Sequence, residues 1–314
     1  MSKRLLKIIV SLAIFSLLFY LVDLKEIITS IGSLTPLTIF YLIMVSVLLV
    51  YLSAIKWSYF IDSFGLKVPV FHLFNLYLVG YFVNLLAPSY IGGDVARSWY
   101  VGKKIGQHNA LTATILERYT GLVAMLGLAT IFIWVVDLVT WPIRIVVLTA
   151  ALGIVAITLM ALSDRSIKII SKIRQLEPLI KHVIKIQDGL RLAKRDKPLL
   201  IKALLLSFLF HSFTVVNVLT AAAAIGWIDP PIIDLFVVLP LILLIGAIPL
   251  APNGLGLQEG AYLYFLTGIG ATPSQALAIG IILRAKGYIL AILGGVVWFC
   301  LRIRKEASRK EYPR

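Results

Sequence analysis

Residues 84–97 read Asn-Leu-Leu-Ala-Pro-Ser-Tyr-Ile-Gly-Gly-Asp-Val-Ala-Arg, and the interpretation of the whole chain starts from this stretch. A proline and two glycines interrupt an apolar run here. Asp94 and Arg97 then place two charges where a membrane-spanning segment would carry apolar residues. This pattern predicts a helix that breaks inside a membrane protein.

The same pattern recurs near the other end of the chain, where residues 250–259 read Leu-Ala-Pro-Asn-Gly-Leu-Gly-Leu-Gln-Glu. Each copy is followed, about one membrane span later, by Arg-x-x-Gly in an apolar run. The matched positions are Leu86-Ala87-Pro88 with Leu250-Ala251-Pro252, Ile91-Gly92 with Leu255-Gly256, and Arg118 and Gly121 with Arg284 and Gly287. The duplication predicts an internal repeat, although short matches of this kind also arise by chance in apolar sequence.

Composition indicates the class of protein. Hydrophobic residues make up 60% of the 314 residues and charged residues 14%, against roughly 25% charged residues in a soluble domain. The mean hydropathy is +0.96. We therefore expect an all-α polytopic membrane protein, because helices satisfy their own backbone hydrogen bonds in lipid.

The net charge of +15 comes mainly from basic residues beside apolar spans, so we interpret it as a topology signal and expect no nucleic-acid partner. The four histidines and the single cysteine show no metal-ligand spacing. The sequence contains no phosphate-binding loop, zinc-protease helix or serine-hydrolase turn. We expect no metal, no cofactor and no enzymatic activity.

The direction of the first spans follows from the excess of Lys and Arg in cytoplasmic loops. With the basic N-terminus inside, residues 5–22 cross outward and a loop runs to Thr35 outside. Residues 36–55 then return, which places Lys56 in the cytoplasm.

The next apolar arm, residues 70–87, creates a conflict if it crosses fully. The segment 163–197, with 10 Lys/Arg against 4 Asp/Glu, would then lie outside. A re-entrant hairpin over residues 70–104 that turns at Pro88 removes the conflict. Such a hairpin is permitted where protein or a wet cavity surrounds it.

The complete assignment has two halves of matching plan. Residues 1–140 contain two spans, the hairpin at 70–104 on the cytoplasmic side, and a third span. Residues 141–314 contain a span, an amphipathic cytoplasmic segment at 163–198, a second span, an outward-facing hairpin at 232–267, a last span and a basic tail. We therefore predict six full spans plus two re-entrant helical hairpins in two inverted repeats, with both termini cytoplasmic.

Several charged residues fall at membrane depth in this topology: Asp94, Arg97, Glu117, Arg118, Glu259, Arg284 and Lys286. Each costs about 3 kcal/mol at the centre of a spanning helix, so these side chains should face a cavity or one another. One interpretation is structural ion pairing, for example Asp94 with Arg97 or Glu117 with Arg284. The other is a substrate site with excess positive charge. The tips of the hairpins favour the second interpretation and leave the first open.

At the tips, Ser89 and Asn253 follow prolines and are good N-cap residues. Each returning arm is predicted to begin there as a helix whose free backbone N–H groups attract an anion. The glycines after each cap would let a headgroup approach the backbone, and Arg118 and Arg284 would add bidentate phosphate contacts. Tight helix packing explains the glycines equally well. The predicted substrate-binding residues are Ser89, Gly92, Gly93, Asp94, Arg97, Glu117, Arg118, Asn253, Gly256, Glu259, Arg284 and Lys286.

Three motifs carry a resemblance to a known family: Gly-Gly-Asp-x-x-Arg at 92–97, Glu-Arg-x-x-Gly at 117–121 and Gly-Leu-Gly-x-x-Glu at 254–259. With these motifs and Arg284, nearly the whole chain resembles the lysylphosphatidylglycerol synthase transmembrane-region family, also called flippase-like or UPF0104 proteins. In that family the membrane part of the multiple peptide resistance factor flips lysyl-phosphatidylglycerol. Archaeal and bacterial relatives are associated with polyprenyl-linked glycolipids.

The resemblance implies a flippase that moves an anionic or phosphate-containing lipid across a bacterial or archaeal cytoplasmic membrane by alternating access. Aminoacyl-phosphatidylglycerol and polyprenyl-phosphate-linked glycolipids are the implied substrate classes. Membrane lipids with an anionic headgroup are the implied partners. The sequence ends at Arg314 without the aminoacyltransferase domain of the resistance factor, so we do not expect synthase activity.

Two other functions stay open at this point. A transporter or channel for a small soluble anion would also suit two opposed hairpins. An accessory subunit of a lipid-modifying enzyme would show neither activity alone. A second copy of the chain and a lipid-synthesis enzyme are open as protein partners. In a flippase, Glu117 or Glu259 would exchange a proton, or would pair with the arginines when the site is empty.

Overall fold

The computed structural model describes residues 3–87, 91–136, 140–163, 184, 187, 197–248 and 250–311. Their regular structure is helical, which confirms the predicted all-α class. The helices are α1 (Lys3–Leu21), α2 (Leu24–Gly32), α3 (Pro36–Asp62), α4 (Val70–Leu86), α5 (Ile91–Ile105), α6 (Gln107–Phe132), α7 (Trp141–Leu162), α10 (Lys197–Ala224), α11 (Ile232–Ala247), the 3-10 helix η2 (Pro252–Gly254), α12 (Leu257–Gly268) and α13 (Pro273–Glu311).

Within the described residues, five helices are long and apolar enough to cross a membrane: α3, α6, α7, α10 and α13. The protein is therefore a multi-pass membrane protein. Part of α1 (Ile9–Leu21), α4 and α11 are shorter apolar helices. With 17 and 16 residues, α4 and α11 each rise about 25 Å, less than the roughly 30 Å hydrocarbon core of a bilayer. These two helices are the first arms of the predicted hairpins. The sixth expected span, residues 5–22, stays a prediction, as does the direction of each crossing.

Residues 24–32 form a helix, α2, where the sequence led us to expect a loop. The Asp23 side chain accepts a hydrogen bond of 2.8 Å from the backbone N–H of Lys25 and so caps the first turn. Ile27 of this helix is buried and packs with Leu18 of α1 and Leu277 of α13. A helix this short is marginal by itself, and its burial against α13 stabilises it.

The helices α4 and α5 pack against each other on either side of residues 88–90. α4 ends at Leu86, close to a proline that cannot continue helical hydrogen bonding. Between α5 and α6 the chain turns at Gly106 alone, whose φ of +88° is a conformation that glycine adopts without strain. This tight turn brings α6 against α5, with which it packs extensively.

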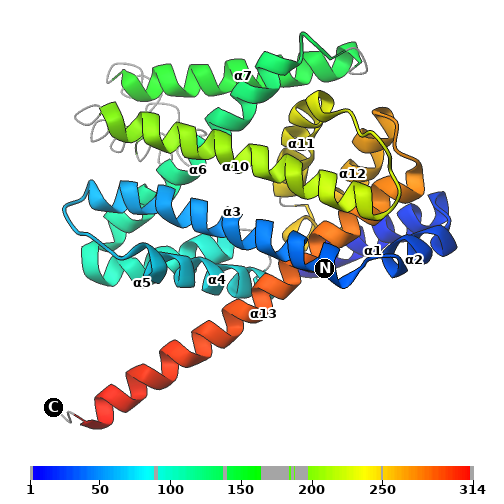
Figure 1. Cartoon of the computed structure of the whole chain (residues 1–314). Coiled ribbons are helices and arrows are strands. Elements are labelled where there is room, and N and C mark those ends of the chain that lie inside the picture. Colours follow the sequence, from blue (N-terminus) through cyan, green and yellow to red (C-terminus); the bar gives the residue numbers. More distant parts are fainter. Residues whose placement is uncertain are drawn as a thin grey trace.

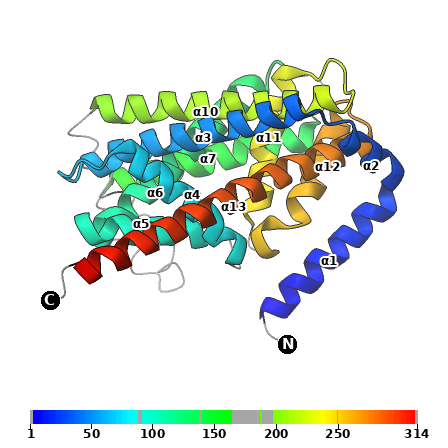
Figure 2. The same ribbon diagram turned by 60° about the horizontal axis from the view of Figure 1, so that its bottom comes forward.

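The helices α11 and α12 form a second pair, joined by η2. α12 has 12 residues and rises about 18 Å, too little to cross a bilayer. Helix α1 lies at the edge of the bundle (Figure 2) and packs on this second pair. The Ser11 hydroxyl of α1 donates a hydrogen bond of 2.8 Å to the carbonyl oxygen of Leu255, directly after η2.

Helix pairing follows the same order in both parts of the chain. α4 packs on α13 and α11 packs on α6, while α5 packs on α6 and α12 on α13. α3 lies along α10 (Figure 1). A Cβ atom on Gly294 of α13 would overlap the carbonyl oxygen of Leu78 on α4, so glycine permits this close crossing. The halves 1–140 and 141–314 are therefore interlocked, and their inverted relation stays a prediction.

Helix α13 is the longest element, with 39 residues, and its C-terminal end projects from the bundle (Figure 1). The stretch after Leu301, expected as a basic tail, continues this helix to Glu311. The predicted amphipathic segment 163–198 lies almost entirely outside the described residues.

Candidate functional site

The structure brings together four of the predicted site residues from α5 and α6. The Nε atom of Arg97 donates a hydrogen bond of 3.0 Å to Asp94 Oδ1, one turn earlier on α5. Arg97 Nη2 donates to Glu117 Oε2 of α6 at 2.7 Å. Arg118, the neighbour of Glu117, donates two hydrogen bonds to Asp94, at 2.8 and 2.9 Å. These four charges form one connected network, which includes the predicted Asp94–Arg97 pair.

Arg97 is deeply buried, with 1% of its surface exposed. Its guanidinium carbon lies 4.4 Å from the ring centroid of Trp57 and 4.0 Å from that of Tyr77. The electron-rich ring faces offset part of the cost of removing this cation from water. Its Nη1 atom has no hydrogen-bond partner among the described residues. Arg97 is therefore a positioning residue that holds Asp94 and Glu117, not a group that a substrate reaches directly.

A fifth charge, Lys56 of α3, joins this network. Its expected place in the cytoplasm was wrong, because α3 continues to Asp62 and carries Lys56 within the helix. Lys56 Nζ lies 3.3 Å from Glu117 Oε1 and donates to Ser207 Oγ of α10 at 3.0 Å. Lys56 is 5% exposed. The first cluster is defined as Lys56, Asp94, Arg97, Glu117 and Arg118.

Arg118 is the accessible member of the first cluster. Its side chain is 57% exposed, that of Asp94 is 20% exposed, and Glu117 beneath them is buried. The cluster contains three cations and two carboxylates, and so one positive charge in excess. A phosphate offers the paired acceptor oxygens that a bidentate guanidinium prefers, as Asp94 does now. The cluster can therefore accept an anion at Arg118 in exchange for Asp94.

Glu259 of α12 and Arg284 of α13 form an ion pair, the second cluster. Arg284 also donates from Nη1 to the carbonyl oxygen of Asn253 at 3.2 Å and from Nη2 to that of Gly254 at 3.3 Å. Its side chain is 13% exposed and that of Glu259 is 1% exposed. The expected pair of Arg284 with Glu117 is wrong. One cation and one carboxylate leave the second cluster balanced in charge.

The start of α12 differs from the prediction. Asn253 was expected as its N-cap, but α12 begins at Leu257 and its N-cap is Gly256. The Glu259 carboxylate accepts a hydrogen bond of 2.7 Å from the Gly256 N–H, so the helix supplies its own anion at this end. Asn253 lies instead in η2, with a left-handed φ of +48°. Ser89, the N-cap expected for α5, lies outside the described residues.

The predicted site glycines lie at close contacts between helices. A Cβ atom on Gly93 would overlap the carbonyl oxygen of Gly80 on α4, and one on Gly92 would overlap the side chain of Ala87, directly after α4. A Cβ atom on Gly256 would lie 3.1 Å from Ile14 of α1. The geometry therefore favours the packing interpretation of these glycines over contact with a headgroup.

Asn84, at the end of α4, links the two clusters and was absent from the sequence-based site. Its side-chain oxygen accepts a hydrogen bond of 2.6 Å from the Gly93 N–H in the first turn of α5. Its backbone carbonyl accepts one from the side chain of Asn253, whose own carbonyl binds Arg284. A lone amide has no spacing signal in sequence, because its partners come from separate elements.

Lys286 lies apart from both clusters. It follows Arg284 by two residues and so points about 200° away around α13. Lys286 is partly buried, and Ile282 and Leu290, one turn to either side, are core residues. No ion pair joins it to another residue in the described part of the chain. Its role in substrate binding stays a prediction.

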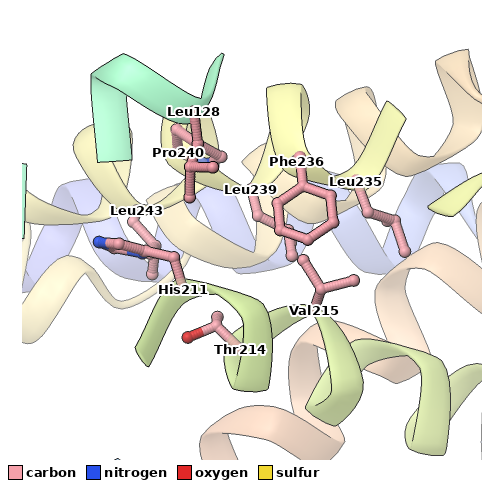
Figure 3. Close-up of a pocket in the computed structure, with 9 residues that line it drawn as sticks. All are labelled: Leu128, His211, Thr214, Val215, Leu235, Phe236, Leu239, Pro240 and Leu243. Atoms are coloured by element: carbon pink, nitrogen blue, oxygen red, sulfur yellow. The ribbon is translucent and has the colours of Figure 1, made fainter. Parts of the chain in front are cut away.

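A separate pocket lies between α6, α10 and α11 (Figure 3). Its walls are mostly apolar, with His211 and Thr214 as polar lining residues from α10. His211 Nε2 lies 3.1 Å from the carbonyl oxygen of Gly121, one turn beyond Glu117. Because no charged side chain lines the pocket, it offers no counter-charge to an anion. Among the described residues, no three His, Cys, Asp or Glu side chains are grouped to hold a metal ion.

Residues 4–295, which include both clusters, match the family described as the lysylphosphatidylglycerol synthase TM region. The chain belongs to this family. Relatives include a UPF0104 membrane protein of Methanothermobacter thermautotrophicus, 23% identical over 289 aligned residues, covering 83% of this chain and 84% of the relative. A UPF0104 membrane protein of Methanocaldococcus jannaschii is 22% identical over 299 residues, covering 86% and 87%. No solved structure matches the chain significantly. The family match confirms the resemblance that the three motifs indicated.

Proposed function

We propose that the protein is a lipid flippase that moves an anionic or phosphate-containing lipid across the cytoplasmic membrane by alternating access. The exposed guanidinium of Arg118 carries the proposal. It sits in the candidate span α6, on a buried cluster with one excess positive charge. Charged groups in spanning segments are costly and commonly mark a substrate path. Aminoacyl-phosphatidylglycerol and polyprenyl-phosphate-linked glycolipids are the proposed substrate classes.

The outer face of α5 supports a lipid over a soluble anion. Ile91, Val95 and Trp99 follow one another at four-residue spacing and are 66%, 53% and 50% exposed. They form an apolar stripe along the helix, and Asp94 lies beside it next to Val95. A molecule with a charged head and an apolar tail can therefore place its head on Arg118 and its tail along this stripe.

In the proposed cycle, the headgroup replaces Asp94 at Arg118, while buried Arg97 keeps Asp94 and Glu117 in place. The contact between Asn253 and the Asn84 carbonyl joins the two tips, so a movement of one helix pair acts on the other. The cycle makes and breaks no covalent bond. We therefore propose a transporter and not an enzyme.

The proposal is tested with purified protein in liposomes that contain tail-labelled phosphatidylglycerol. Labelled lipid should move between leaflets in wild-type vesicles. Arg118→Ala should lower the initial rate at least about tenfold, because a charge-assisted hydrogen bond contributes about 1.5–3 kcal/mol. Arg144→Ala, which removes the same cation type from α7, should keep the wild-type rate. An unchanged rate in Arg118→Ala would contradict the assigned role.

Parallel vesicles loaded with sulfate or phosphate separate the alternatives. Efflux of the anion without movement of lipid would support a transporter or channel for soluble anions. Absence of both activities, together with copurification of a lipid-modifying enzyme, would support an accessory subunit. Either result would contradict the flippase proposal.

A further inference from the structure

Lys56 has a fixed place inside the first cluster although no headgroup reaches it. Its Nζ atom contacts the Glu117 carboxylate and donates to the Ser207 hydroxyl, which in turn donates at 2.8 Å to the carbonyl oxygen of Ala203. A Cβ atom on Gly121 would lie 3.3 Å from Lys56 Nζ, so the glycine leaves space for the ammonium group. This contact explains why the Glu-Arg-x-x-Gly motif has a glycine at position 121.

The charges around Lys56 do not balance. Asp94 is shared between Arg97 and Arg118, and Glu117 is shared between Arg97 and Lys56. Two carboxylates therefore serve three cations. Without Lys56 the cluster would contain two ions of each sign and would be neutral. The excess positive charge of the first cluster therefore depends on Lys56. A bound anion can neutralise this excess at Arg118, the accessible cation of the cluster.

We infer that Lys56 is the specificity-determining residue of the site and makes it select a headgroup with a single negative charge, such as a phosphodiester. The inference rests on the proposed function. An uncompensated charge in a membrane protein interior is costly, and a monoanion at Arg118 brings the cluster to neutrality. A headgroup whose ammonium cancels the phosphate charge, as in phosphatidylethanolamine or aminoacyl-phosphatidylglycerol, leaves the excess in place. A phosphomonoester dianion reverses its sign. The inference therefore narrows the two proposed substrate classes to phosphodiester lipids without an ammonium group.

Charge-changing variants of Lys56 and Glu117 separate this role from a packing role. Lys56→Gln keeps polar atoms for Ser207 and Glu117 and makes the cluster neutral. Glu117→Gln raises the excess to two positive charges. The double variant has the original excess of one. If only packing mattered, the double variant would be the most impaired of the three, whereas charge selection requires it to recover.

The experiment measures equilibrium binding of short-chain lipids to the full-length protein in detergent at pH 8. Phosphatidylglycerol, phosphatidylethanolamine and phosphatidic acid with identical tails supply the three charge states. Wild type should bind phosphatidylglycerol at least about tenfold more tightly than phosphatidylethanolamine, and Lys56→Gln should lose this preference. Glu117→Gln should prefer phosphatidic acid, and the double variant should regain the wild-type order. The control Lys67→Gln removes an exposed lysine after α3 and should leave the order unchanged.

An unchanged preference in Lys56→Gln contradicts the inference, as does a double variant that fails to recover. If Lys56→Gln does not fold, Glu117→Gln decides, because a shift toward phosphatidic acid supports the inference and the wild-type order contradicts it. Liposomes with tail-labelled forms of the same lipids test the function separately. Charge-dependent binding without movement of any lipid would contradict the flippase and support the inference. Movement of lipid without a charge preference in binding would support the flippase and contradict the inference.

Discussion

The two tips share a sequence pattern but use their arginines differently. At the first tip, Arg118 is 57% exposed and gives its two hydrogen bonds to the single carboxylate of Asp94. At the second tip, Arg284 is 13% exposed and binds Glu259, the side chain of Gln258 and two backbone carbonyls. The Arg-x-x-Gly pattern therefore does not decide the role of its arginine.

The two arginines differ in how many groups of the protein accept hydrogen bonds from the five N–H donors of each guanidinium. Arg284 donates to residues of η2 and of the first turn of α12, so it holds these two elements against α13. Arg118 donates hydrogen bonds to one carboxylate, that of Asp94, which another anion can replace, and its Nε lies 3.9 Å from Glu117 Oε2. The first cluster also holds an excess charge, through Lys56, and the second cluster is balanced. For this reason the proposed anion site is placed at the first cluster, whereas the contacts of Arg284 hold η2, α12 and α13 together.

The largest expected effect is a loss of stability at the second tip. Glu259→Ala leaves Arg284 without its carboxylate and Gly256 without its acceptor, which should lower the free energy of unfolding by about 3–5 kcal/mol. Asp94→Ala is the matched change at the first tip and should cost less, because Arg118 is exposed and Arg97 keeps Glu117. Thermal unfolding in detergent, followed by tryptophan fluorescence, measures both. Equal losses would remove the distinction between the tips.

A smaller loss of stability is expected at the close contact between the backbones of α4 and α5. Gly93→Ala places a methyl group against the carbonyl oxygen of Gly80 and should lower stability by about 1–3 kcal/mol. Gly127→Ala in α6 is the control, because a Cβ atom there meets nothing within 4 Å. The control should be neutral or stabilising by up to about 1 kcal/mol. The same unfolding measurement compares the pair, and equal midpoints would show that the contact is not required.

The smallest effect is expected at the link between the tips. Asn84→Ala removes the acceptor for the Gly93 N–H and should cost about 1 kcal/mol, as loss of a helix cap does. It should also slow lipid movement a few-fold, because the start of α5 positions Asp94. Asn84→Asp keeps the acceptor oxygen and should retain wild-type stability. A full rate in Asn84→Ala would show that the hydrogen bond from Gly93 to the Asn84 side chain is not needed to position Asp94.

The sequence predicted the helical class, five of the six expected spanning segments and the short apolar arms, because these depend on apolar length and on proline. It also predicted the Asp94–Arg97 pair, since residues three apart share a helix face. Ion pairs between different helices depend on how the helices pack, and the sequence did not predict them. Glu117 was paired with Arg284, whereas α3 supplies Lys56 to Glu117 and α12 supplies Glu259 to Arg284.

Three further errors each have a cause that the structure shows. Lys56 was taken as the end of a span, but α3 extends six residues beyond it and buries it against α10. Asn253 is of a residue type favoured at N-caps, but asparagine also suits the left-handed conformation that it adopts in η2. The helix at 24–32 depends on burial against α13, which no local pattern shows.

The most direct test of the account locates the bound lipid. Phosphatidylglycerol with a photoreactive group in its tail is crosslinked to wild type and to Arg118→Ala, and the modified peptides are identified by mass spectrometry. We expect crosslinks on the outer face of α5, at Ile91, Val95 and Trp99, and we expect Arg118→Ala to lose most of them. Crosslinks concentrated on α12 and α13 around Arg284, or unaffected by Arg118→Ala, would contradict the account.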